Sequence, residues 1–358
     1  MFEQLAERTA YESRIDALKL AFAPMMFQAA KVARDAGLLA ALDRHDQGQA
    51  QWSWQTLEAL ETTTKLPVYA LRVLLEAALA IGLVEAKDEQ YRLTRMGHFM
   101  LHDELTRVNM DFVHDVCYRG MFHLDEAIAQ GAPAGLKTLG DWPTIYEGLS
   151  RLPEHVRTSW LNFDHYYSDQ SFPQALPAVF DRPVKHLVDI GGNTGKWTRL
   201  CLEHNPDVRV TIVDLPGQLA IAKSQLEPLG LMDRVTLHAA NLLEPNPTLP
   251  CDADVVWMSQ FLCCFAEAEI ETILRNVAPS LAPGGRVCIL ETFWDQQQYE
   301  IAAHCLIATS LYFTAMANGN SREYRSDDML ACVRRAGLRP AGETRGLGMG
   351  HTLLQCCK

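Results

Sequence analysis

The sequence predicts an α/β protein in which a doubly wound, Rossmann-like parallel sheet follows an all-α N-terminal domain. After Pro183, short β-rich runs alternate with helical segments, which is the order that builds a parallel sheet. Before that point, apolar residues recur at spacings of three and four. At 358 residues the chain is long enough for two domains, because a single core seldom grows far past roughly 250 residues.

Composition and charge narrow the class of protein. Hydrophobic residues make up 48% of the chain and charged residues 21%, so the sequence can bury large cores and is not of the disordered type. The net charge of -12 repels phosphate backbones and anionic membranes. We therefore expect neither a nucleic-acid partner nor a membrane partner.

The N-terminal segment and the cysteines point to the cytoplasm. The first twenty residues carry acids and bases throughout, unlike a signal peptide, and no run reaches the ~18 uninterrupted apolar residues of a membrane helix. None of the ten cysteines forms a C-x-x-C pair or joins a spaced histidine cluster. We expect reduced thiols, no metal site and a cytoplasmic protein.

Residues 1–105 form the expected N-terminal domain. Helical patterns over 54–60 and 66–75 precede a hairpin pattern at 82–85 and 91–94, which together predict a winged-helix unit. A DNA-reading helix over 68–81 would need several basic side chains, but it carries only Arg72 and Glu76 as charges. Apolar faces such as 25–27 and 71–75 favour packing against a second subunit instead, so we expect a homodimer.

Residues 106–180 are expected to form a helical linker that contributes to a substrate pocket. This segment is rich in aromatic side chains, which more often build a core than a ligand site. Some of them must line a pocket if the C-terminal half binds a small molecule. The aromatic residues are Phe122, Trp142, Tyr146, Trp160, Phe163, Tyr166 and Tyr167.

Residues 181–358 are expected to hold the parallel sheet. Its ligand should lie at the carboxyl ends of the strands, where such sheets bind small molecules. The expected strands are 186–190, 208–213, 235–238, 254–258 and 286–290.

The strongest motif is Leu-Val-Asp-Ile-Gly-Gly-Asn-Thr-Gly over 187–195, a buried strand that enters a glycine turn and a helix. Gly191, Gly192 and Gly195 allow the tight turn and a close approach of backbone amides to a ligand. The next strand ends in Asp214, whose carboxylate can accept both hydrogen bonds of a ribose diol. Together these features indicate a cofactor that contains adenosine.

The acidic residue that precedes the glycine turn indicates which adenosine-containing cofactor the site binds. A nicotinamide site would show G-x-G-x-x-G, whereas here Asp189 precedes an adjacent glycine pair. A carboxylate at this position attracts the ammonium group of an amino acid and repels a pyrophosphate. S-adenosyl-L-methionine carries such an ammonium, so we expect it to be the cofactor.

On these motifs the chain resembles the class I S-adenosylmethionine-dependent methyltransferases, and within them the plant-type small-molecule O-methyltransferases with a winged-helix dimerisation domain. The resemblance covers most of the chain and implies an aromatic acceptor, free or tethered to a carrier. It adds expected cofactor contacts beyond the turn and Asp214. These are Leu215 in Val-Asp-Leu-Pro, Asn241 and Leu242 where the family has an adenine-contacting acid, Ser259 where a lysine is common, and Tyr167 in Phe-Asp-His-Tyr-Tyr.

One departure from the family concerns the catalytic base. The family usually shows Leu-His-Asp-Trp where this chain has Leu-Cys-Cys-Phe, so Cys263 replaces the histidine that deprotonates a hydroxyl. Glu291 matches a family acid that orients this base. A second family acid is either shifted to Glu323 or replaced by Tyr324.

Four residues are therefore candidates for catalytic work: Glu291, Cys263, His165 and, at the position of the second family acid, Tyr324. Cys263 is an awkward base because its thiolate could itself take the methyl group, and it can serve as pocket wall. His165 and His304 are substitute bases, although a lone histidine is more often structural. Glu291 is the preferred candidate, because its position in the sequence matches that of the family acid.

Three functions follow from these features. The first is a methyltransferase for a small, phenolic aromatic, acting on oxygen or ring carbon in secondary metabolism. The second is a family member that binds the cofactor but has lost methyl transfer, as a non-methylating enzyme or a partner subunit. The third, a winged-helix regulator, is disfavoured by the charge.

Overall fold

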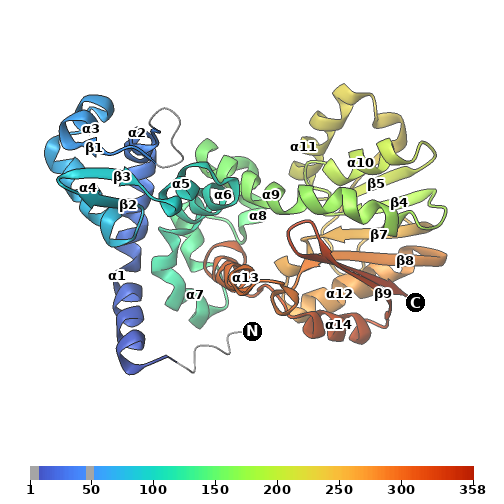
Figure 1. Cartoon of the computed structure of the whole chain (residues 1–358). Coiled ribbons are helices and arrows are strands. Elements are labelled where there is room, and N and C mark those ends of the chain that lie inside the picture. Colours follow the sequence, from blue (N-terminus) through green and yellow to red (C-terminus); the bar gives the residue numbers. More distant parts are fainter. Residues whose placement is uncertain (1–7, 46–51) are drawn as a thin grey trace. The chain divides into compact units, whose positions relative to one another are not determined.

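The computed structural model describes residues 8–45 and 52–358. The chain divides after Asp111 into an N-terminal and a C-terminal unit, each with its own core (Figure 1). The sequence pattern predicts this boundary at residue 105. Residues 112–180, most of the predicted helical linker, belong to the C-terminal unit.

The N-terminal unit contains the expected helices and hairpin. Its three strands pair antiparallel in the order β1-β3-β2, and β2 and β3 form the hairpin predicted from the sequence. The winged-helix arrangement of two helices followed by a hairpin is therefore present. The elements are α1 (Ala10–Asp35), α2 (Leu38–Leu42), β1 (Gln55–Thr56), α3 (Leu57–Thr64), α4 (Val68–Ala80), β2 (Val84–Lys87), β3 (Gln90–Leu93), α5 (Arg95–His102) and α6 (Glu104–Phe112).

The apolar surface of this unit differs in part from the expectation. Leu71 and Leu75 are fully buried in the unit's own core, so they do not supply an outward face, and this part of the prediction was wrong. On α4 and α5, Tyr69, Val73 and Phe99 are exposed. Further exposed apolar side chains lie along α1, the long blue helix of Figure 1. They include Leu18, Leu20, Phe22 and Met25.

The C-terminal unit is built on a seven-stranded sheet of order β6-β5-β4-β7-β8-β10-β9. The five strands from β4 to β8 are parallel and lie where the sequence predicted them. Two antiparallel strands at one edge were not predicted, because β9 is almost wholly exposed and carries a proline and glycines without apolar alternation. The strands are β4 (His186–Ile190), β5 (Arg209–Asp214), β6 (Val235–Ala239), β7 (Ala253–Ser259), β8 (Leu281–Thr292), β9 (Arg339–Leu347) and β10 (His351–Cys357).

Helices cover both faces of this sheet, which makes the fold doubly wound. One hydrophobic cluster packs α12 and α14 on the sheet, and a second packs the end of α9 with α10 and α11. A third cluster joins aromatic residues of 112–163 to those of 312–317. The helices are α7 (Leu124–Gln130), α8 (Ile145–Gly148), α9 (Glu154–Val179), α10 (Lys196–His204), α11 (Pro216–Leu226), α12 (Glu267–Val277), α13 (Glu300–Tyr312) and α14 (Ser326–Arg335).

One helical segment, residues 300–317, is long and apolar enough to span a membrane by length and composition alone. Core helices of soluble proteins meet the same criterion. Tyr312 and Phe313 of this segment are buried in the aromatic cluster of the C-terminal unit. Ile301, Ile307 and Leu311 of the same segment are exposed, so packing within the fold covers only part of it.

Candidate active site

A pocket of about 400 Å³ opens at the carboxyl ends of the parallel strands. It lies where the chain order reverses, since β5 and β7 flank β4 on opposite sides, and open α/β sheets bind their ligands at such a point. One end is lined by the segments that follow β4, β5 and β6, and the other by the aromatic cluster. A single cavity therefore joins a polar end to an aromatic end.

The glycine turn forms the floor of the polar end. Gly191 has φ +68°, and a Cβ atom there would lie 2.4 Å from the ring of Phe261. Gly192 is equally confined, because its Cβ would lie 2.7 Å from Ile212. Both residues line the pocket, as the sequence predicted, whereas Gly195 does not. Gly195 instead begins α10 in the left-handed region, close against Leu226.

Asp189 ends β4 beneath the turn and lines the pocket. It is 2% exposed, and Thr198 Oγ1 donates a hydrogen bond of 2.6 Å to its Oδ2. Burial raises the pKa of Asp189 to about 7, although the bond from Thr198 works against this shift. A cation in the pocket would keep this carboxylate ionised.

Asp214 holds the turn to the next strand. Its Oδ2 accepts from the backbone N–H of Asn193 at 3.0 Å, and its Oδ1 accepts from the N–H of Leu215 at 2.7 Å. Burial raises the pKa of Asp214 while these two hydrogen bonds lower it. Because each carboxylate oxygen has a second lone pair, both remain able to accept from a ribose diol.

Two buried hydroxyls show that the polar end suits a polar ligand. Thr194 Oγ1 and Ser259 Oγ are buried, line the pocket and have no hydrogen-bond partner within the protein. Buried polar groups are normally paired, so these two fit donors or acceptors of a bound cofactor. The sequence singled out Ser259 but not Thr194, although Thr194 lies inside the glycine motif.

The remaining expected cofactor contacts divide into two groups. Leu215, Asn241 and Leu242 line the pocket beside the turn. Tyr167 is not among the lining residues, and its ring packs against Phe163 and Tyr166. The residues that fit an S-adenosylmethionine molecule are thus Asp189, Gly191, Gly192, Asp214, Leu215, Asn241, Leu242 and Ser259, with Thr194 added by the structure.

The aromatic end is built from residues far apart in the sequence. Trp160 Nε1 donates to Tyr312 Oη at 2.7 Å, and Phe163 stacks on Phe112 with 3.9 Å between ring centroids. Of the aromatic residues that the sequence suggested for the pocket, Tyr146 also lines it. Phe122 does not line the pocket and is 91% exposed. No sequence signal identified Tyr312, because its segment joins the pocket only through tertiary packing.

Cys263 lies in the pocket wall at the junction of the two ends. Its neighbour Cys264 and its burial raise the pKa of the Cys263 thiol well above the usual range. A thiol that stays protonated cannot act as a general base near neutral pH. The structure therefore supports the interpretation that Cys263 is part of the pocket wall and not a catalytic base.

Glu291 and Tyr324 are both turned to the protein rather than to the pocket. Glu291 Oε1 accepts from the backbone N–H groups of Phe261, Leu262 and Cys263, at 3.0, 2.8 and 3.3 Å. Tyr324 donates from Oη to the carbonyl of Phe265 at 2.6 Å. Neither residue lines the pocket, so both position the segment that carries Cys263.

Glu323, the alternative to Tyr324 in the sequence, does line the pocket. Its Oε2 accepts from Thr292 Oγ1 at 3.1 Å, and the side chain is almost fully buried. Burial, and to a lesser degree the nearby Glu291, raises the pKa of Glu323 to about 8. This carboxyl can therefore exchange a proton near neutral pH.

Of the two candidate histidines, one lines the pocket and the other does not. His165 is a lining residue, and its Nδ1 lies 3.7 Å from Oδ1 of Asp169, which also pairs with Lys196 at the start of α10. These contacts connect His165 to the glycine-turn end. His304 is not a lining residue.

Comparisons with known proteins agree with this geometry. Residues 170–339 match the model of the O-methyltransferase domain, and residues 14–91 match that of the Dimerisation2-like domain. The two matches, the sheet and the cofactor pocket define an S-adenosylmethionine-dependent methyltransferase fold. Residues 170–339 thus carry an O-methyltransferase domain, for which S-adenosylmethionine is the cofactor, and residues 14–91 carry a Dimerisation2-like domain.

Individual relatives differ in their reactions. Aclacinomycin 10-hydroxylase RdmB of Streptomyces purpurascens is 29% identical over 66% of this chain and 63% of its own length, so the match spans less than two thirds of that relative. L-tyrosine C(3)-methyltransferase of Streptomyces lavendulae is 22% identical over 75% of this chain and 73% of its own. The O-methyltransferase NcsB1 from neocarzinostatin biosynthesis, solved with S-adenosylmethionine and 2-hydroxy-5-methyl naphthoic acid, is 20% identical with a TM-score of 0.68, covering 94% of this chain and 95% of its own.

Proposed function

We propose that this protein is a methyltransferase that moves the methyl group of S-adenosylmethionine to a small aromatic acceptor of secondary metabolism. The observation that carries the proposal is the single cavity in which a cofactor end, with Asp189 and Asp214, opens onto an aromatic end, with Trp160 and Tyr312. The naphthoic acid bound by NcsB1 indicates the size and aromatic character of such an acceptor.

When bound, S-adenosylmethionine supplies an electrophilic methyl group. The glycine turn and Asp214 would hold the adenosine part, and Asp189 would bind the amino-acid part. The aromatic walls would orient the acceptor and exclude water, which supplies much of the catalysis in a displacement of this type. Glu323 accepts the proton that the acceptor hydroxyl loses, because its raised pKa of about 8 lets it take up a proton near neutral pH, whereas Asp189, the other lining carboxyl with a pKa near neutral, is assigned to the cofactor.

A pair of glutamine variants tests the proton transfer. Glu323→Gln should lower kcat by roughly 10²- to 10⁴-fold, since a general base contributes about that much. The matched control is Glu291→Gln, whose amide oxygen can still accept the backbone N–H bonds to residues 261–263. In the unaltered enzyme, kcat/KM should rise with pH through about 8, the pKa of Glu323. A pH profile that is the same in Glu323→Gln and the unaltered enzyme would remove Glu323 from this role.

A second candidate function is a cofactor-binding protein that has lost methyl transfer. Two observations favour it: Cys263 stands where the family has its catalytic histidine, and one relative is named a hydroxylase. If this candidate is correct, acceptors will leave the enzyme without a new methyl group, and no S-adenosylhomocysteine will accumulate. Mass spectrometry of both products separates the two functions.

We also propose that the protein acts as a cytoplasmic homodimer. Exposed Leu18, Leu20, Phe22 and Met25 on α1 are the kind of surface that a second copy covers, and the Dimerisation2-like match lies over the same helix. Light scattering should give twice the chain mass of 40.1 kDa at micromolar concentration. A monomer under these conditions would contradict the dimer. Whether the acceptor is free or tethered to a carrier, and whether oxygen or ring carbon is methylated, follows from the identity of the acceptor.

A further inference from the structure

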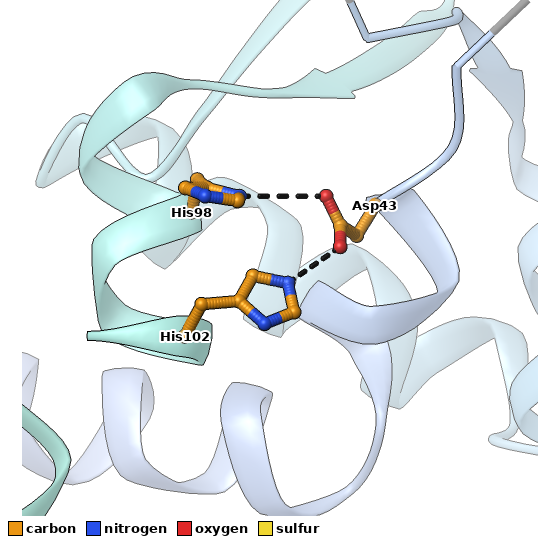
Figure 2. Close-up of side chains that lie close together, drawn as sticks. All are labelled: Asp43, His98 and His102. Atoms are coloured by element: carbon orange, nitrogen blue, oxygen red, sulfur yellow. Dashed lines mark hydrogen bonds and ion pairs between the residues drawn. The ribbon is translucent and has the colours of Figure 1, made fainter. Parts of the chain in front are cut away.

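Three metal-ligating side chains converge in the N-terminal unit, outside the active-site pocket (Figure 2). Asp43 follows the end of α2, and His98 and His102 lie four residues apart on α5. One ligand atom from each residue lies within 4.8 Å of those of the other two. The function proposed above uses none of these groups.

The close-up shows both imidazole rings turned toward the carboxylate (Figure 2). His102 Nε2 lies 2.6 Å from Asp43 Oδ2, and His98 Nδ1 lies 3.7 Å from Asp43 Oδ1. His98 Nδ1 is buried and has no hydrogen-bond partner within the protein. A buried nitrogen without a partner, aimed at a carboxylate, is an incomplete polar site.

The backbone fixes the direction of the two histidines. Residues at i and i+4 project from the same face of a helix, so α5 presents both rings together. The N-cap Thr94 holds the first turn through a bond from the N–H of Gly97 to its Oγ1 at 3.1 Å. Gly97 lets α5 lie close to the hairpin, since a Cβ there would be 2.3 Å from the carbonyl oxygen of Leu83.

Asp43 is oriented by a partner of its own. Trp52 Nε1 donates to Asp43 Oδ1 at 2.7 Å, so the oxygen that faces His98 is also held by Trp52, and Oδ2 is left to His102. A carboxylate that accepts a hydrogen bond from a further side chain is the usual arrangement of a carboxylate metal ligand.

We propose that Asp43, His98 and His102 bind a divalent transition-metal ion, with Zn²⁺ as the best fit and water as the fourth ligand. Two imidazole nitrogens and one carboxylate oxygen are donors that zinc prefers. Ligand atoms of a tetrahedral zinc ion lie roughly 3.4 Å apart, and one ligand atom from each of the three residues lies within 4.8 Å of the other two, so side-chain movements would bring them to the distances of a zinc site. The two histidine side chains are 39% and 48% exposed, which leaves room for the ion to enter and for the water.

The ion would stabilise the N-terminal unit by cross-linking two of its elements. It would connect α2 to α5, two elements that are separated by more than fifty residues of sequence and contact each other in the fold. Binding to the folded unit alone would raise its stability as the metal concentration rises. The sequence signal is the spacing His-x-x-x-His on a predicted helix, which needs Asp43 from the tertiary structure to complete a site.

The test uses the full chain, stripped with a chelator and titrated with zinc chloride by calorimetry. We expect one zinc ion per chain at this site and a Co²⁺ absorption spectrum typical of tetrahedral nitrogen and oxygen ligands. His98→Ala and His102→Gln should each weaken zinc binding by more than about tenfold, and Trp52→Phe, which removes only the outer hydrogen bond, by about tenfold. The matched control is His123→Ala, because His123 pairs with Glu126 at 3.3 Å without belonging to the metal-ligand cluster.

Two outcomes would overturn the proposal. One is a zinc affinity in His102→Gln equal to that of the unaltered chain and of the His123→Ala control. The other is a Co²⁺ spectrum with thiolate charge-transfer bands, which would place the ion on cysteines instead. Circular dichroism shows whether each variant is folded, and exposed His102 gives a readout even if a substitution at half-buried His98 unfolds the unit.

Discussion

Asp214→Ala perturbs the cofactor site at the residue on which most of its contacts depend. The carboxylate accepts from the N–H groups of Asn193 and Leu215, and its remaining lone pairs face the pocket. Alanine removes the ribose acceptors and also leaves two backbone N–H groups without partners. Both cofactor affinity and the free energy of unfolding should therefore fall.

The two effects can be given magnitudes. Loss of a hydrogen bond to a charged group costs about 1.5 to 3 kcal/mol, which weakens S-adenosylmethionine binding by about 10- to 150-fold. Unpaired backbone groups lower the free energy of unfolding by roughly 1 to 3 kcal/mol. Asp214→Asn, which keeps one side-chain oxygen as an acceptor, should lie between alanine and the unaltered chain in both quantities.

The chain offers a matched control at the opposite end of the sheet. Asp254 Oδ2 accepts from the backbone N–H groups of Lys185 and His186 at 2.7 and 3.0 Å, but the residue does not line the pocket. Asp254→Ala should therefore lose stability without losing affinity. Calorimetry with S-adenosylmethionine and thermal unfolding measure the two quantities separately. Equal affinities for Asp214→Ala and Asp254→Ala would refute the assignment of Asp214 to the ribose.

Three further predictions follow from the pocket. Gly191→Val should abolish cofactor binding, measured by calorimetry, because its side chain would meet Phe261 and strain a left-handed backbone; a variant that binds normally would exclude the turn from the site. Cys263→Ser should keep most of the turnover, because the thiol stays protonated and only forms part of the pocket wall. Cys263→His should gain no turnover, because imidazole is too large for the space that the thiol fills. An inactive serine variant in a steady-state assay would show that the thiol takes part in the reaction. The raised pKa values of Glu291 and Glu323, about 7 and about 8, mean that the folded chain binds more protons than the unfolded chain above their ordinary value of 4.5. The free energy of unfolding should therefore fall as pH rises from about 4.5 to 8, and denaturant titrations of Glu323→Gln should show a shallower fall.

The sequence predicted the parallel core of the sheet because buried strands and glycine turns leave local signals. Strands β4 to β8 are short apolar runs, and the turn at Gly191 carries its own motif. The edge strand β9 has no such signal, because its exposed residues need no apolar alternation. Residues that line the cofactor end of the pocket were predicted for the same reason, since most follow a strand directly.

The catalytic end of the site was harder to predict. Glu291 and Glu323 are both buried acids, and only tertiary structure shows that the first accepts hydrogen bonds from a turn while the second faces the cavity. Tyr324 follows Glu323 in the sequence and Tyr167 precedes Ser168, and both of these neighbours line the pocket. The side chains of Tyr324 and Tyr167 make their contacts elsewhere. Which neighbour faces the cavity depends on packing that spans the unit.

The most direct test of the central claim is a transfer experiment with S-adenosylmethionine whose methyl group is fully deuterated. The full chain is incubated with this cofactor and a panel of phenols and hydroxynaphthoic acids, and acceptor and cofactor products are read together by mass spectrometry. We predict that at least one acceptor gains one intact deuterated methyl group for each S-adenosylhomocysteine formed. Tight cofactor binding without S-adenosylhomocysteine, or an acceptor altered without the deuterium label, would contradict methyl transfer as the function of this site.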